Sequence, residues 1–174
     1  MNEQSNKALI VIDLQNDYFP DGKFPLWNTD EVISNIESVI QSANKKNIPV
    51  ILVQHIANAE KGIAPFFNQG SDGVNIHPRI LQAAPNAELV VKEFADSFEH
   101  TRLEEILNER NIDELLICGM MTQNCVTHTA ISKKAERYKV SILADCCTSV
   151  DQMIHNIALN AVSTRIPFNS KEQL

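Results

Sequence analysis

The run Ala8-Leu9-Ile10-Val11-Ile12 decides the fold class, because every position in it is apolar. A strand with one solvated face alternates apolar and polar residues, whereas an unbroken apolar run is typical of a strand covered on both faces. These residues therefore predict a central strand of a parallel sheet. Outward along the chain, similar apolar runs predict further strands at residues 49–53, 88–91, 115–118 and 140–144.

Amphipathic segments separate the predicted strands. Thr29, Asp30 and Glu31 supply a cap and first-turn acids for a helix that continues to about Asn47. The inward face of this helix is predicted to consist of Val32, Ile33, Ile36, Val39, Ile40 and Ala43. Further helices are expected at about residues 101–110, 122–137 and 152–164. The repeating strand-helix order predicts an α/β fold, a three-layer α/β/α sandwich with a mainly parallel sheet.

The segment 55–87 interrupts this regular pattern. It shows little periodicity and contains Gly62, Pro65, Gly70, Gly73, Pro78 and Pro85. We therefore expect an irregular excursion rather than further sheet or long helix. Excursions of this length in a compact domain often shape an active site, so this segment is expected to influence substrate choice.

Length and charge restrict the class of protein. The 174 residues fit a single domain, residues 1–174, with no Gly/Ser/Pro-rich linker. A net charge of −7 would repel a phosphate backbone, so we expect no nucleic-acid partner. No apolar run approaches the roughly 18 residues of a transmembrane helix, and Met1–Lys7 lacks the features of a signal peptide. We therefore expect a cytoplasmic protein without membrane contact, whose cysteines stay reduced: Cys118, Cys125, Cys146 and Cys147.

Three predicted strand ends carry distinctive chemistry. Asp13 follows the first strand, in the unusually polar exit Asp13-Leu14-Gln15-Asn16-Asp17, and Lys92 follows the third. Cys125 follows the fourth strand, in Gly119-Met120-Met121-Thr122-Gln123-Asn124-Cys125-Val126, directly before a predicted helix that Thr122 would cap. Functional groups of open parallel sheets gather at the carboxyl ends of strands. A helix start and a nearby cation would both favour a thiolate, and Asp13 could take up its proton.

Each of these residues also has an ordinary structural interpretation. A free cysteine is most often a small buried residue, Lys92 could be a solvated strand end, and Asp13 could be a turn residue. His128, three residues beyond Cys125, could replace Asp13 as the base in a Cys-His dyad. Neighbours at this spacing on one helix point outward nearly in parallel, which disfavours direct proton transfer between them.

Metal and nucleotide motifs are not evident in the sequence. The five histidines, His55, His77, His100, His128 and His155, form no HxxxH or HExxH pattern, and the cysteines form no CxxC pair. A metal-dependent amidase that uses His55 and His77 stays open as a rival interpretation. No GxGxxG or Walker loop is present, so we expect neither a metal nor an organic cofactor.

Three segments, Val11–Phe19, Val90–Lys92 and Gly119–Val126, closely resemble the isochorismatase-like cysteine hydrolase superfamily. The resemblance extends from about Ala8 to Thr164. It implies a parallel sheet of six strands rather than the five counted above, with the sixth after Ile166. It also implies an Asp-Lys-Cys catalytic triad, which falls on Asp13, Lys92 and Cys125. A cis peptide between Met120 and Met121, an oxyanion hole formed by the N–H groups of Met121 and Cys125, and assembly into dimers or tetramers are further implications.

Two differences within that superfamily narrow the expected activity. Nicotinamidases carry an Asp-x-His metal motif after the second strand, where this chain reads Val53-Gln54-His55-Ile56-Ala57. Isochorismatases proper, which cleave a vinyl ether, typically lack the cysteine nucleophile, so Cys125 favours carbonyl chemistry. We therefore predict a cysteine hydrolase that cleaves a C–N bond of a small amide, ureido or carbamoyl compound through a thioester. Phe19 and Phe67 are predicted to line its substrate pocket. The alternative is a catalytically silent or redox-sensing binding protein on the same scaffold.

Overall fold

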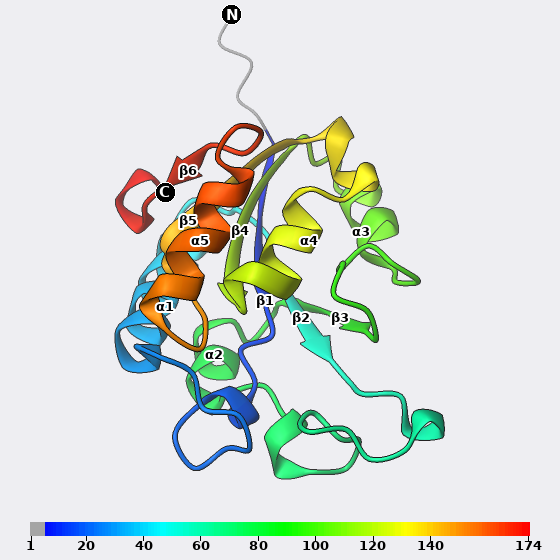
Figure 1. The fold of residues 1–174 in the computed structure, drawn as a ribbon. Coiled ribbons are helices and arrows are strands. Elements are labelled where there is room, and N and C mark those ends of the chain that lie inside the picture. Colours follow the sequence, from blue (N-terminus) through cyan, green and yellow to red (C-terminus); the bar gives the residue numbers. More distant parts are fainter. Residues whose placement is uncertain (1–5) are drawn as a thin grey trace, which may run out of the picture.

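A six-stranded parallel sheet forms the centre of the protein, and helices flank it (Figure 1). The structure is a computed structural model that describes residues 6–174; Met1–Ser5, part of the segment in which we expected no signal peptide, lie outside the described residues. The strands are β1 (Lys7–Ile12), β2 (Val50–His55), β3 (Glu88–Lys92), β4 (Glu114–Met120), β5 (Lys139–Thr148) and β6 (Phe168–Asn169). The helices are α1 (Thr29–Lys45), α2 (Pro78–Ala83), α3 (Leu103–Glu109), α4 (Thr127–Ala130) and α5 (Gln152–Val162).

The strand order β3-β2-β1-β4-β5-β6 separates the helices into two layers. The chain steps from β1 to β2 to β3 in one direction across the sheet, and from β3 back to β4, β5 and β6 in the other. Because crossovers between parallel strands are right-handed, helices from the two directions lie on opposite faces. Accordingly α1 contacts α2, and α4 contacts α5 (Figure 1). The predicted α/β/α sandwich is confirmed, with six strands.

The apolar runs occupy the positions that their composition predicts. Residues 8–12 of β1 are at most 1% exposed, because β1 lies between β2 and β4 with helices over both faces. The predicted inward face of α1 is buried at all six positions, Val32, Ile33, Ile36, Val39, Ile40 and Ala43. Among the helices of residues 6–174, none combines the length and apolar character needed to cross a bilayer.

The prediction of one helix over residues 122–137 is wrong. Thr122–Val126 form a π-helical turn, with the Val126 N–H donating to the Met121 carbonyl, and α4 then ends at Ala130. Ser132 begins a separate 3-10 helix, where its hydroxyl accepts a hydrogen bond from the Lys134 N–H. A serine side chain that bonds nearby backbone in this way competes with continuation of an α-helix.

Other differences concern element ends and one missed helix. The helix expected at 101–110 is α3, Leu103–Glu109, and β5 is longer than the apolar run that predicted it. The short helix α2 lies inside the segment expected to be irregular; His77 caps it and Pro78 occupies its first turn. Pro is favoured at that position because its missing N–H would have no partner there.

The carboxyl ends of β1 and β4 meet at the point where the direction of the crossovers reverses. From β1 the chain continues outward to β2, and from β4 it continues outward to β5 on the other side. In open parallel sheets the crevice for ligands lies at this switch point, because the loops that follow the two strands diverge to opposite faces. Asp13 directly follows β1, and the loop with Cys125 directly follows β4.

Gly119 allows β4 to approach β1 at this point. It pairs with Ile12, has a φ of +125°, and a Cβ atom added to it would lie 2.1 Å from the Ile12 carbonyl oxygen. We expect Gly119→Ala to lower the free energy of unfolding by at least about 3 kcal/mol, because it combines backbone strain with a clash against backbone that cannot move aside.

Gly70→Ala is the matched control for this prediction. Gly70 also has a positive φ, +79°, but no atom lies within 4 Å of the Cβ that alanine would add. We expect a loss of about 1–2 kcal/mol, from strain alone. Urea unfolding of both variants measures the difference, and equal losses would contradict the importance of the close approach of β4 to β1.

Candidate active site

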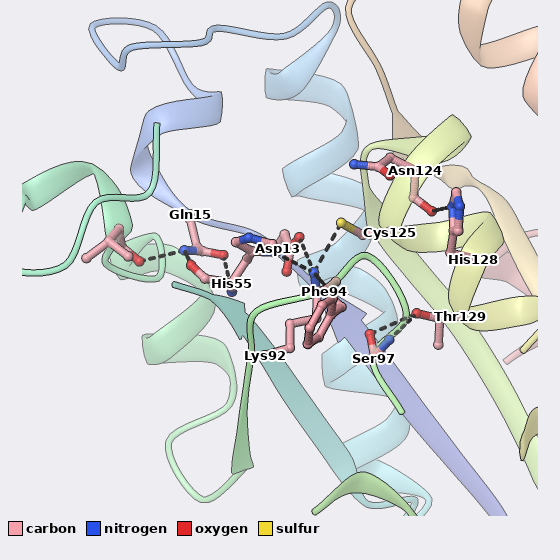
Figure 2. Close-up of polar contacts among 11 residues, drawn as sticks. Asp13, Gln15, His55, Lys92, Phe94, Ser97, Asn124, Cys125, His128 and Thr129 are labelled. Atoms are coloured by element: carbon pink, nitrogen blue, oxygen red, sulfur yellow. Dashed lines mark hydrogen bonds and ion pairs between the residues drawn. The ribbon is translucent and has the colours of Figure 1, made fainter. Parts of the chain in front are cut away.

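Three strand ends bring Asp13, Lys92 and Cys125 into one cluster. The Lys92 Nζ atom lies 3.1 Å from Asp13 Oδ2 and 3.1 Å from Cys125 Sγ (Figure 2). Asp13 is 0% exposed, and Lys92 and Cys125 are each 2% exposed. Asp13 has a φ of +56°, in the left-handed region that Asp tolerates better than most residues. A carboxylate, an ammonium and a thiol therefore meet in a site that excludes bulk water.

Two further acceptors complete the surroundings of the Lys92 ammonium. The Phe94 carbonyl oxygen lies 3.0 Å from Nζ, and His55 Nδ1 lies 2.9 Å from it. Burial disfavours the charged amine, but the negative charge of Asp13 and the interaction with Cys125 outweigh burial and raise the Lys92 pKa above its ordinary 10.5. Lys92 is accordingly a charged ammonium at neutral pH.

The Cys125 thiol differs from the thiolate that the sequence favoured. Burial raises the Cys125 pKa above its ordinary value, the charge of Asp13 raises it further, and Lys92 lowers it. The expected helix start is also a single π-helical turn rather than the first turn of a long helix. Cys125 is therefore a protonated thiol in this closed site, and it needs Asp13 to take its proton.

The same cluster decides how well a metal ion fits. Ligand atoms of Asp13, His55 and Cys125 lie within 4.8 Å of one another, and they form the one such group found among residues 6–174. The Lys92 ammonium lies within about 3 Å of each of these three residues, so it occupies the position that a cation would take. Asp13, His55 and Cys125 therefore surround the ammonium of Lys92, and this arrangement does not fit a metal ion.

The two histidines of the alternative interpretations lie away from the thiol. His77 caps α2, where its Nδ1 accepts a hydrogen bond from the Arg79 N–H, and its ring packs against Phe19. His128 is exposed, and its Nδ1 donates to the Asn124 carbonyl oxygen in the π-helical turn that precedes α4 (Figure 2). The pair of His55 and His77 that the metal-dependent amidase required is therefore not formed. The pair of Cys125 and His128 that the Cys-His dyad required is not formed either.

Thr122 has a different role from the helix cap that the sequence predicted. Met121 precedes the π-helical turn in extended backbone, so Thr122 already lies inside the turn. The Thr122 hydroxyl lies 3.1 Å from the Thr148 carbonyl oxygen and 2.7 Å from His155 Nδ1. It therefore ties the turn that carries Cys125 to the end of β5 and to α5.

The remaining predicted residues lie close to this cluster in different ways. Met121 is 7% exposed, and the peptide between Met120 and Met121 is cis. The Phe67 ring packs edge-on to Tyr18 and lies 5.9 Å from the His55 ring, whereas Phe19 packs against His77. Phe67 thus lies beside His55, whereas the ring contact of Phe19 is with His77, outside the cluster. The contacts of Phe19 and Phe67 with substrate stay predictions.

Sequence reasoning missed the residues that support the cluster. The Gln15 side chain accepts a hydrogen bond from the His55 N–H and donates to the His55 carbonyl oxygen. The Asp17 carboxylate, 2% exposed, accepts a hydrogen bond from the Phe67 N–H. Their signal was the unusually polar exit of the first strand, Asp13-Leu14-Gln15-Asn16-Asp17. Ser97 and Thr129 form a further buried contact, which joins the loop after Lys92 to α4.

The fold and the site together define a class of protein. A parallel α/β sandwich that buries a cysteine, a lysine and a carboxylate at its switch point is a hydrolase of the isochorismatase-like type. The family model of the isochorismatase domain matches residues 7–168. The chain belongs to the isochorismatase family.

Individual relatives agree with this family. The uncharacterized isochorismatase family protein YddQ of Bacillus subtilis is 35% identical over 149 residues, covering 86% of this chain and 81% of YddQ. A nicotinamidase of Escherichia coli is 26% identical over 179 residues, covering 83% and 84% of the two chains. The crystal structure of a provisional isochorismatase hydrolase from Oleispira antarctica superposes with a TM-score of 0.88 at 28% identity, covering 99% of this chain and 97% of that one.

Proposed function

We propose that the protein is a metal-independent cysteine amidohydrolase, with Asp13, Lys92 and Cys125 as its catalytic residues. The observation that carries this proposal is the position of the Lys92 ammonium, 3.1 Å from both the Asp13 carboxylate and the Cys125 sulfur, in a buried site. A base, a cation and a nucleophile at these distances are the components that thiol-mediated acyl transfer requires.

The first half of the reaction transfers the acyl group to sulfur. Asp13 takes the proton of the Cys125 thiol, and the sulfur electron pair attacks the carbonyl carbon of the substrate. The N–H groups of Met121 and Cys125 donate to the resulting oxyanion, a type of contact whose loss typically costs about 10²- to 10³-fold in rate. Asp13 then returns the proton to the departing nitrogen, which leaves as ammonia or an amine while the thioester forms.

The second half of the reaction releases the acid. Asp13 takes a proton from a water molecule, whose oxygen attacks the thioester carbonyl carbon. The same two N–H groups hold the second oxyanion, and its collapse expels the Cys125 sulfur, which recovers the proton from Asp13. Lys92 stabilises negative charge alternately on the sulfur and on the Asp13 carboxylate, so it needs to stay charged throughout.

A small carboxamide is the substrate class that the relatives favour. The nicotinamidase of Escherichia coli covers most of this chain, and nicotinamide is a small aromatic amide. Phe67, beside His55, offers an aromatic surface close to the catalytic groups. We therefore propose small aromatic carboxamides first, and ureido or carbamoyl compounds second, because both present a carbonyl carbon bonded to nitrogen. Nicotinamide itself is less favoured, because this chain lacks the Asp-x-His motif of nicotinamidases.

The first experiment is ammonia release from a panel of small amides and ureides, with and without a metal chelator. We expect release that the chelator leaves unchanged, because the Lys92 ammonium occupies the centre of the Asp13, His55 and Cys125 donors. Complete loss of activity with chelator, restored by added metal, would contradict the proposal and favour the metal-dependent alternative.

A redox-sensing protein is the second outcome that the same preparation can test. If the panel gives no ammonia release, and peroxide oxidises Cys125 reversibly as detected by mass spectrometry, the redox-sensing alternative is supported instead. The raised Cys125 pKa disfavours that outcome, because the thiolate is the form that reacts with peroxide. A cytoplasmic location and a dimeric or tetrameric state stay predictions, and sedimentation of the purified protein tests the latter.

A further inference from the structure

His55 makes a contact that the proposed reaction does not use. It is the register partner of Lys92 across the β2–β3 pair, so the two side chains leave the same face of the sheet at neighbouring positions. His55 Nδ1 lies 2.9 Å from Lys92 Nζ, the shortest of the four contacts that surround the ammonium (Figure 2). This contact places an imidazole directly against the cation of the site.

The direction of this hydrogen bond follows from the charge of Lys92. A charged ammonium can only donate, so His55 Nδ1 must accept. An imidazole that accepts through Nδ1 is neutral and carries its proton on Nε2. Burial lowers the His55 pKa below its ordinary 6.5, and the positive charge of Lys92 lowers it further, which agrees with a neutral ring.

The position of His55 is itself held by a buried side chain. Gln15 is 0% exposed and bonds the backbone of His55 on both sides, with its Oε1 atom 2.8 Å from the His55 N–H and its Nε2 atom 2.7 Å from the His55 carbonyl oxygen. Gln15 Nε2 also donates to the Val74 carbonyl oxygen at 2.8 Å. Both the amino group and the oxygen of the Gln15 amide are therefore hydrogen-bonded. They hold the end of β2 at His55 against the segment that contains Val74.

We propose that His55 is a positioning residue that orients the Lys92 ammonium toward Asp13 and Cys125. An ammonium has three N–H groups at fixed angles to one another, so an N–H bonded to His55 determines where the other two point. The other two N–H groups donate to the Phe94 carbonyl oxygen and to the Cys125 sulfur, and the Asp13 carboxylate forms an ion pair with Nζ at 3.1 Å. Without His55 the ammonium can rotate, and rotation moves all three N–H groups together.

Two substitutions of nearly equal shape separate this role from packing. His55→Asn keeps an acceptor close to the position of Nδ1, whereas His55→Leu removes it. This expectation rests on the proposed amidase function. We expect His55→Leu to lower kcat by about 10- to 100-fold with little change in KM, as small displacements of catalytic groups typically do. The kcat of His55→Asn should stay within about threefold of the wild-type value. Equal activities of the two variants would overturn the proposal. His100→Asn, at an exposed histidine outside the cluster, is the control.

The pH profile provides a second readout. The groups that face His55 are Lys92, which opposes its protonation, Asp13 and Glu93, which favour it, and the Cys125 thiol. When His55 gains a proton, Nδ1 becomes a donor and a second cation lies beside Lys92. We therefore expect wild-type kcat to fall as the pH drops through the His55 pKa, below 6.5, and this step to be absent in His55→Asn, whose side chain does not titrate. An unchanged acid limb in His55→Asn would overturn the proposal.

Nitrogen NMR of the histidine rings tests the contact without any substrate. In protein labelled with ¹⁵N-histidine, the His55 signal is assigned by its loss in His55→Asn. We expect an unprotonated Nδ1 and a protonated Nε2 at neutral pH, and a titration midpoint that rises in Lys92→Met because the repelling charge is gone. A protonated Nδ1, or a midpoint that does not respond to Lys92→Met, would overturn the proposal. If the amide panel fails while these NMR results hold, the proposed function is wrong and the contact between His55 and Lys92 stands.

Discussion

Replacing Cys125 with alanine is expected to lower amide turnover by at least about 10³-fold, because the reaction then has no atom to carry the acyl group. The thiol is 2% exposed and lies at the switch point between β1 and β4, so few other groups can reach the same carbonyl carbon. Steady-state ammonia release at saturating amide measures the loss. Mass spectrometry of rapidly quenched wild-type enzyme should show an acyl adduct on the peptide that contains Cys125, and the variant should show none.

Cys118→Ala is the matched control for Cys125→Ala. Cys118 is also a buried free cysteine, on β4 seven residues before Cys125, and burial raises its pKa as well. It lies inside the strand rather than at the strand end, so its loss should cost at most about 1–2 kcal/mol of stability, as for other small core truncations, and little activity. Turnover by Cys125→Ala at the level of Cys118→Ala would exclude the thioester mechanism.

Replacing Lys92 with methionine is expected to destabilise the fold as well as abolish activity. The side chains of Lys92 and Asp13 are both 0% exposed, and they form an ion pair of 3.1 Å. Methionine has a similar length but no charge, so the Asp13 carboxylate would remain buried without its cation. Removal of one partner of such a pair typically costs about 3–5 kcal/mol, because the other charge is left uncompensated. Urea unfolding at neutral pH measures this loss.

The double variant Asp13→Asn/Lys92→Met distinguishes an uncompensated charge from a packing defect. Asparagine removes the buried charge that Lys92→Met leaves behind, so the double variant should be at least about 1–2 kcal/mol more stable than Lys92→Met alone. It should also be inactive, because both the proton acceptor and the cation are gone. The stabilities of Asp13→Asn and Lys92→Met are also measured separately. If the double variant loses the sum of the two single losses in unfolding free energy, the destabilisation has a different cause from the buried carboxylate.

Most of the fold could be predicted from the sequence, because the strands are marked by apolar runs and the longest helix by a periodic apolar face. The apolar run 8–12 indicated a central strand, and the six inward positions of α1 all proved to be buried. Prediction failed where a few local hydrogen bonds decide between similar backbone paths. The π-helical turn at Thr122–Val126 and the Ser132 cap interrupt a segment whose composition is compatible with one helix. Short-range alternatives of this kind differ by too little free energy for composition to separate them.

The candidate site was predicted in its members but not in its electrostatics. Asp13, Lys92 and Cys125 were each marked by a strand end, and the structure brings all three together. The sequence favoured a thiolate, yet the structure raises the Cys125 pKa, because burial and the charge of Asp13 outweigh Lys92. Burial depends on which segments cover the site, and those segments are distant in sequence.

The sequence by itself determined the order of β1 to β5 and of α1, α3 and α5, and it identified three residues at the carboxyl ends of strands, because periodicity and residue type are local properties. Only the tertiary structure decided what surrounds the Lys92 ammonium. His55 reaches it through strand pairing, Phe94 through the loop after β3, and Gln15 fixes His55 from the exit of β1. The Lys92 ammonium lies among Asp13, His55 and Cys125, at the position that a metal ion would need. These contacts join residues that are 33 positions apart for Lys92 and Cys125, 37 for His55 and Lys92, and further still for Asp13 and Lys92. No local pattern encodes such contacts, since they exist only once the sheet has formed.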